Sequence, residues 1–384
     1  MKTHKFLISL VILVLVASAC ATAPTQAPTL AVPTQAPTTA APTQALAATA
    51  TAAFPTGPVH LTLFVFAAPG HKDVPEAVVK NYMTAHPNVK IDVIEGSNST
   101  EFPQMLAAYQ TTPNQPLIDV GFYNQTTESN GAIAGMWDTI DSANVPNLKY
   151  ILPQFRQPED RGVSFATGFY GLLYNTKFVK TPPTSYSVLW DEQYKGKVAE
   201  WDYQWEELVM AARMNGGSES NIDPGFKLLE QHLDMFQSLY TSNDQAKNLL
   251  ISGDVWFTIF DVQIAQTWVK ADSTVPIGVA IPQEGLISWP LYINITKGLT
   301  PDQKFVADDL VNQFLSPETI SAYCIATNYV PTATGITLPA NLMALPQFAP
   351  EVAKNALLFD WTTINKNNAA WTQRWDREIK ANLK

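Results

Sequence analysis

The stretch GFYGLLYNT at residues 168–176 decides the fold, because it predicts a buried strand in the middle of the chain. A Pro-Pro turn follows at 182–183, and then a short helix for which Thr184 or Ser185 would be the N-cap. The run YKGKV at 194–198 then leads into another strand, with a glycine at the turn. This order of strand, turn, helix and strand is typical of an α/β protein.

The chain before this stretch also alternates between strands and helices. The predicted elements, in chain order, are strand 61–66, helix 74–86, strand 89–94, helix 102–110 and strand 117–122. The same alternation recurs over 196–282. Such an order predicts a mostly parallel sheet with helices on both faces, and ligands of such sheets bind at the carboxyl ends of the strands. We therefore expect site residues directly after the strands, at 67–71 and 123–126.

Residues 59–384 have the composition of a globular protein, and they exceed what one compact core usually supports. Two lobes are therefore expected. This part holds all 34 acidic residues but 22 of the 24 Lys and Arg, which gives it a formal charge of −12. That charge disfavours nucleic acid as a partner and is compatible with a cationic ligand.

The N-terminus has the layout of a secretory signal. Lys2 and Lys5 precede an apolar run at 6–17, which is too short to span a membrane, and the sequence ASAC ends at Cys20. A cysteine at this place resembles the lipobox of bacterial lipoproteins. The resemblance implies a signal peptide at 1–20, lipidation of Cys20 and a location at the extracytoplasmic face of the bacterial cell membrane. The alternative is a plain secretory leader. Cys324, the other cysteine, is expected to be a buried thiol.

Residues 21–58 repeat Pro-Thr-Gln-Ala and related units, and they contain no charged residue. This composition cannot build a core, so we expect a disordered tether in extended polyproline conformation. At about 3.1 Å per residue, it could hold the globular part up to roughly 100 Å from the membrane.

Longer parts of the sequence resemble one family. The resemblance rests on GLLYNT at 171–176 and LWD at 189–191 with YKGKV at 194–198, and further stretches agree in order and spacing: NVPNL at 144–148, GDV at 253–255, PQEG at 282–285 and FLSPE at 314–318. These stretches are similar to ABC-transporter substrate-binding proteins of the spermidine/putrescine-type group.

The resemblance implies an α/β fold of the type II periplasmic-binding-protein class, with two lobes that close on a ligand. Lobe 1 would comprise 59–164 plus 290–384 and lobe 2 would comprise 165–289, with a two-crossing hinge near Phe165 and Trp289. A monomeric protein of this class would deliver a small solute to ABC transporter permease subunits and would not be an enzyme.

The candidate ligand-binding residues follow the predicted strands, where aromatic faces and carboxylates could hold a cation. They are Tyr123, Asn124, Thr126, Asp202, Tyr203, Glu206, Phe260, Asp261, Trp289 and Tyr329. The alternative is structural: Asp202 would cap the helix that runs to Met214, and Phe260 and Trp289 would be core residues.

By resemblance, Glu206 matches an amine-binding acid of the polyamine-binding members, whereas a second acidic position falls on Tyr203. At the place of a further aspartate the chain has Leu291. The resemblance therefore implies a small polar solute that contains an amine, and it puts polyamine itself in doubt. Ferric iron, phosphonate, sugar, a sensor partner and an extracellular hydrolase using Asp202 and Glu206 remain as alternatives. The sequence shows no cofactor motif, and its histidines have no metal-site spacing.

Overall fold

The computed structural model describes residues 53–68 and 70–383, which belong to one compact unit. The predicted signal peptide, Cys20 and the tether up to residue 52 lie outside the described residues. Within the described part, no helix is long and apolar enough to cross a membrane.

The strands form one mixed sheet with the order β2-β1-β3-β9-β4-β7-β5-β6, and β8 and β10 also pair with β4. The strands are β1 (Val59–Phe66), β2 (Val89–Gly96), β3 (Val120–Asn124), β4 (Val163–Asn175), β5 (Val198–Trp201), β6 (Phe236–Tyr240), β7 (Phe257–Asp261), β8 (Ile277–Ala280), β9 (Ile287–Ile295) and β10 (Val330–Pro331). Parallel pairing is confined to the two ends of this order, where β1 pairs with β2 and β3, and β5 pairs with β6 and β7. The expected mostly parallel sheet is corrected to a mixed one, because β4 and β9 run antiparallel to their neighbours.

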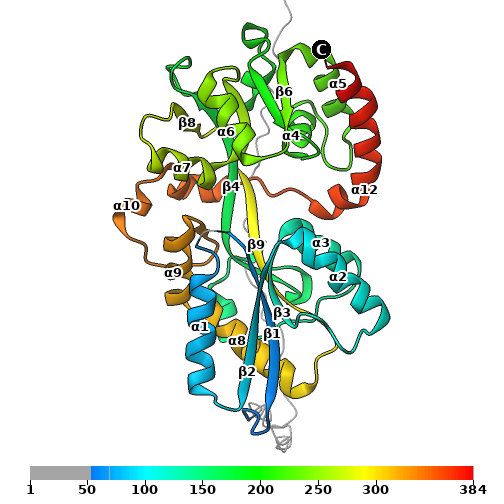
Figure 1. Ribbon diagram of the computed structural model, residues 1–384, viewed down its shortest axis with the longest axis vertical. Helices are drawn as coiled ribbons and strands as arrows, with labels where there is room; N and C mark the ends of the chain where they lie inside the picture. Colours follow the sequence, from blue (N-terminus) through cyan, green and yellow to red (C-terminus); the bar gives the residue numbers. More distant parts are fainter. Residues whose placement is uncertain (1–52, 69, 384) are drawn as a thin grey trace, which may run out of the picture. The chain divides into compact units, whose positions relative to one another are not determined.

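The helices cover this sheet, and most of them follow a strand directly (Figure 1). They are α1 (Asp73–Ala85), α2 (Asn98–Thr111), α3 (Gln125–Ile133), α4 (Glu206–Met214), α5 (Asp223–Gln231), α6 (Asn243–Ser252), α7 (Val262–Ala271), α8 (Pro301–Phe314), α9 (Pro317–Thr327), α10 (Ala340–Met343), α11 (Pro350–Lys354) and α12 (Trp361–Arg374). Their beginnings follow local chemistry: α8, for example, has Thr300 and Gln303 as a reciprocal capping box.

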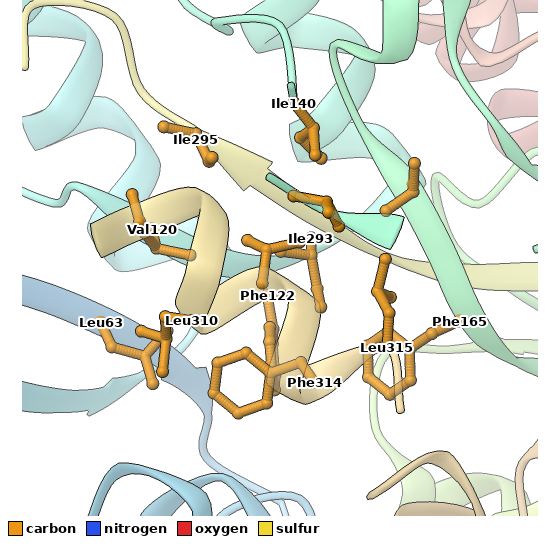
Figure 2. Packing of buried hydrophobic residues seen from close by; sticks show 14 of the residues in the cluster. Leu63, Val120, Phe122, Ile140, Phe165, Ile293, Ile295, Leu310, Phe314 and Leu315 are labelled. Carbon is orange, nitrogen blue, oxygen red and sulfur yellow. The ribbon is translucent and has the colours of Figure 1, made fainter. Parts of the chain in front are cut away.

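Two large cores define two lobes. In the lobe 1 core, Phe122 and Ile293 of the sheet pack with Phe314 of α8 (Figure 2). The lobe 2 core surrounds α4, with Leu208 and Phe257 among its fully buried members. The long strands β4 and β9 connect the two groups of elements (Figure 1). The first part of β4 pairs with β9, and its second part pairs with β7 and β8.

The C-terminal segment packs in lobe 2. Ile364 and Trp371 of α12, together with Trp375 and Ile379 of the following helical turn, belong to the lobe 2 core. Their spacing places them on one apolar helical face, which is buried against α4 and its neighbours. The end of the chain, from about residue 357, therefore has its apolar face in the lobe 2 core, although the expected boundary placed it in lobe 1.

The expected tether ends earlier than residue 58. The ring of Phe54 stacks on His86 at a centroid distance of 4.1 Å and meets Phe305 edge-on at 5.7 Å. The side-chain amide of Asn88 donates to the carbonyl oxygens of Pro55 at 3.0 Å and Gly57 at 2.8 Å. The ring of Phe54 and the side-chain amide of Asn88 therefore attach the chain to lobe 1 just before β1.

Candidate ligand-binding site

A cavity of about 490 Å³ lies between the two lobes, within the size range of small-molecule sites. Lobe 1 contributes the beginnings of α2 and α3, and lobe 2 contributes the loop before α4 and one face of α12. The lining residues are Asn98, Ser99, Asn124, Thr126, Thr127, Asn130, Tyr203, Gln204, Trp205, Glu206, Trp289, Trp361, Asn365 and Asn368.

The lobe 1 wall consists of small neutral polar side chains because two helices begin there. The hydroxyl of Ser97 caps α2 by accepting from the backbone N–H of Thr100. The side chain of Asn124 caps α3 by accepting from the backbone N–H of Thr127 at 2.9 Å. Capping selects such residues at helix starts. Of the two caps, Asn124 lines the cavity, and Ser97 directly precedes the lining residues Asn98 and Ser99.

Glu206 is the carboxylate of this lining. It is the first residue of α4 and is only 3% exposed, and its Oε1 has no hydrogen-bond partner. Burial raises the pKa of Glu206 to about 7, although backbone N–H groups at the helix start oppose this shift. The site therefore holds a carboxylate that is only partly ionised near neutral pH.

Asp202 is tied to the C-terminal segment. One carboxylate oxygen accepts from the indole N–H of Trp375 at 3.0 Å, and the other accepts from the ammonium of Lys380 at 2.8 Å. The expected cap is wrong, because α4 begins after Trp205 and has no side-chain cap. Asp202 does not line the cavity.

Tyr203 lines the cavity from a strained backbone position. Its φ of 61° lies in the left-handed region, which is uncommon for a residue other than glycine. Its hydroxyl donates to Asp376 at 2.7 Å and accepts from Lys380 at 2.8 Å, and the Lys380 ammonium also lies 4.3 Å from the ring centroid. These contacts hold the side chain beside the cavity, and the residue is 41% exposed.

Indole rings form the apolar part of the walls. Trp289 of β9 meets Trp361 edge-on at 5.3 Å and lies 5.1 Å from the ring of Tyr170. The indole N–H of Trp205 donates to Asn368 at 2.8 Å, which positions both side chains. Trp289 is therefore placed at the cavity, as one of the two sequence interpretations expected.

Tyr123 and Phe260 are placed in the protein core instead. Strand β3 continues beyond its predicted end at residue 122, and Phe260 lies within β7 instead of after a strand. Alternation therefore turns these side chains away from the cavity. The ring of Tyr123 lies between Phe64 and Trp137, at 5.5 and 5.1 Å. Phe260 packs 5.1 Å from Trp268.

Asp261 and Tyr329 are also absent from the lining. Asp261 caps α7 by accepting from the backbone N–H of Ile264 at 2.7 Å, and burial raises its pKa to about 6. The ring of Tyr329 packs edge-on against His71 at 5.1 Å. Of the sequence candidates, Asn124, Thr126, Tyr203, Glu206 and Trp289 are brought together.

Helix α12 was missed at the sequence level. Its Trp361, Asn365 and Asn368 line the cavity, and their spacing of four and three residues places them on one helical face. This periodicity predicts that the three residues share one face of a helix, but no local sequence pattern indicates which part of the protein that face contacts. The lining residues Asn98, Ser99, Thr127, Asn130, Gln204 and Trp205 were missed as well.

Two hydrogen bonds connect α12 to the lobe 1 wall. The side-chain amide of Asn365 donates to the backbone oxygen of Thr126 at 2.9 Å. The hydroxyls of Ser129 and Thr362 lie 3.2 Å apart. Because α12 is anchored in the lobe 2 core, these bonds join the two lobes beside the cavity.

Comparison with known proteins identifies the family. A sequence profile described as "Bacterial extracellular solute-binding protein" matches residues 77–350. The chain belongs to this family. The family expected from the sequence and the α/β fold of the type II periplasmic-binding-protein class are thereby confirmed. The proteins compared below and the family itself are solute-binding proteins rather than enzymes.

Individual relatives differ in what they bind. The spermidine/putrescine-binding periplasmic protein of Escherichia coli (strain K12) is 25% identical over 258 residues, covering 64% of this chain and 69% of that protein. An ABC transporter structure from Clostridium perfringens has a TM-score of 0.70 and 21% identity, covering 84% of this chain and 99% of that chain. Iron-bound HitA from Pseudomonas aeruginosa has a TM-score of 0.63 and 17% identity, and the match covers 84% of this chain and 99% of that chain. These structural likenesses show the shared fold.

Proposed function

We propose that this solute-binding protein is the lipid-anchored substrate-binding component of an ABC importer, which captures a small amine-containing solute and delivers it to permease subunits. The observation that carries the amine assignment is Glu206, a buried carboxylate with an unpartnered oxygen in a cavity walled by Trp289, Trp361 and Tyr203. An ammonium would supply the missing partner, and the ring faces would cover its alkyl or cationic surface.

Charge distinguishes an amine from the other solutes. Among the described residues that line the cavity there is no Lys or Arg, so an anionic solute would meet the Glu206 carboxylate without a compensating cation. Iron is a weaker candidate, because the described residues contain no group of three or more His, Cys, Asp or Glu able to hold a metal ion.

A hydrolytic pair of Asp202 and Glu206 is not supported by the geometry. Both oxygens of Asp202 are occupied by Trp375 and Lys380, and the residue does not line the cavity. A sensor partner would use the same binding site as a transport protein, and the genes beside this one would distinguish these two roles.

Binding is expected to close the two lobes about β4 and β9, near Phe165 and Trp289. Strand crossings of this kind concentrate the backbone change in a few residues. Small-angle scattering with and without the bound solute measures the closure. Identical scattering profiles would contradict a solute-driven closure.

The solute can be identified directly. Mass spectrometry after denaturation would reveal the molecule that co-purifies with the protein. Calorimetry would then rank the affinities of the protein for polyamines, amino acids, phosphonates, sugars and ferric iron. We expect an amine to bind most tightly. An anion or a neutral sugar as the tightest binder would overturn the amine assignment and leave the solute-binding role intact.

Replacing Cys20 by alanine is expected to release the protein from the membrane into the soluble fraction. The reason is that stable anchoring needs two or more acyl chains, each buried CH₂ contributing about 0.8 kcal/mol. Fractionation of cells followed by detection of the protein measures this, with Cys324→Ala as the matched control that should stay on the membrane. Membrane retention of the Cys20→Ala protein would rule out the lipid anchor.

A further inference from the structure

We infer that the solute is a hydroxylated monoamine with a ring, such as an amino sugar, held with its ammonium on Glu206 and its hydroxyls on the lobe 1 wall. This rests on the proposed amine-binding function and specifies the class of amine.

The cavity can neutralise one positive charge. Glu206 is the one acidic residue of the lining that the structure describes. Of the nearby acids, Asp202 is paired with Lys380 and Asp261 caps α7. Glu200 and Glu207 are buried and have unpartnered oxygens, but they do not line the cavity. Leu291 of β9 is an apolar member of the lobe 1 core. A second ammonium would therefore find no carboxylate in the lining.

The wall opposite Glu206 has unsatisfied neutral groups. Asn98 is 4% exposed, and neither its amide nitrogen nor its amide oxygen has a hydrogen-bond partner. Such a side chain needs a partner that accepts and donates at the same place, which a hydroxyl group does. Ser99, Asn124 and Asn130 add further neutral polar groups to this wall.

The indole walls complete the match to a sugar ring. Trp289 and Trp361 meet at an interplanar angle of 89°, so they present two surfaces to the cavity at a right angle. A ring with an apolar C–H face and a polar edge can cover one indole while its hydroxyls reach the amides. A linear diamine would cover the rings, and its second ammonium could donate to the Asn98 amide oxygen, but it would offer no acceptor to the Asn98 amide N–H₂.

The test compares four probes by calorimetry on the full-length protein in detergent: glucosamine, glucose, putrescine and spermidine. Glucosamine is expected to bind about tenfold more tightly than glucose, which lacks the ammonium, and about tenfold more tightly than putrescine or spermidine, which lack hydroxyls. Asn98→Ala should weaken glucosamine binding about tenfold and should weaken putrescine binding by a smaller factor, because putrescine can use only the amide oxygen. The exposed Asn114→Ala serves as control, and thermal melting of each variant confirms that it is folded.

Asn98→Asp provides a second readout, because it adds a carboxylate to the lobe 1 wall. This variant should gain affinity for putrescine relative to wild type. Tighter binding of putrescine than glucosamine by wild type, with dependence on Glu206, would overturn the inference and leave the proposed function standing. Failure of glucosamine to bind at millimolar concentration would also overturn it. Equal binding of glucose and glucosamine, unaffected by Glu206→Gln, would overturn both this inference and the proposed amine-binding function.

Discussion

Glu206→Gln is expected to weaken binding of the amine solute by at least about tenfold, because removing one partner of a buried charged hydrogen bond costs about 2–5 kcal/mol. Glutamine keeps the shape of the side chain and the packing at the start of α4, so the change isolates the charge. Titration calorimetry measures the loss. Glu230→Gln, an exposed change on α5, is the matched control. Wild-type affinity in the Glu206→Gln protein would show that the ammonium does not bind there.

The affinity of the wild type should also depend on pH. The ammonium favours ionised Glu206, whose pKa in the empty site is raised to about 7 by burial. Affinity is therefore expected to fall as the pH drops below about 7, by roughly tenfold per pH unit well below it. Below this pH, binding should release a proton, which calorimetry in buffers of different ionisation enthalpy detects. A flat pH profile between 5 and 8 would contradict the role of Glu206.

The same carboxylate lowers the stability of the empty protein at high pH. The pKa of Glu206 is higher in the folded state than its usual 4.5, so the folded state binds the proton more tightly. The contribution of this group to the free energy of unfolding falls as the pH rises from 4.5 through 7. Above pH 7 the protein has lost the whole contribution, about 3 kcal/mol. Solute-free Glu206→Gln should therefore melt at a higher temperature than wild type at pH 8, with little difference near pH 4.

A disulfide between lobe 1 and α12 is expected to trap the solute. The hydroxyls of Ser129 and Thr362 lie 3.2 Å apart, so cysteines at these positions should be close enough to join. If solute release requires α3 and α12 to separate, oxidised Ser129→Cys/Thr362→Cys protein should exchange its solute at least about a hundredfold more slowly than the reduced protein. Stopped-flow exchange with a labelled solute measures the rate.

Each single cysteine variant controls for the substitutions, and Cys324 is buried and should not compete for the new thiols. Reduction should restore the exchange rate. Equal rates in the oxidised and reduced double variant would show that the solute leaves without separation of the two helices.

Local sequence patterns were sufficient for several of the elements and for part of the candidate site. Strand β1, helix α1 and strand β2 lie within two residues of their predicted bounds, because each has a strong apolar pattern and a clear turn. Asn124 and Glu206 were found because a residue that begins a helix after a strand lies at the carboxyl edge of the sheet. Tyr123 and Phe260 were misplaced by strand ends that the pattern set too early, since one further residue reverses the side-chain direction.

The folded chain alone decided which distant groups meet. Asp202 is a residue type that commonly caps a helix or binds a cation. In the folded chain, however, its two carboxylate oxygens accept hydrogen bonds from Trp375 and Lys380, which lie near the end of the sequence. Asn365 and Trp361 reach the cavity because the apolar face of α12 is buried in lobe 2, which directs its polar face toward lobe 1. Such contacts depend on how buried surfaces of separate elements fit together, and no local pattern of residues encodes that fit.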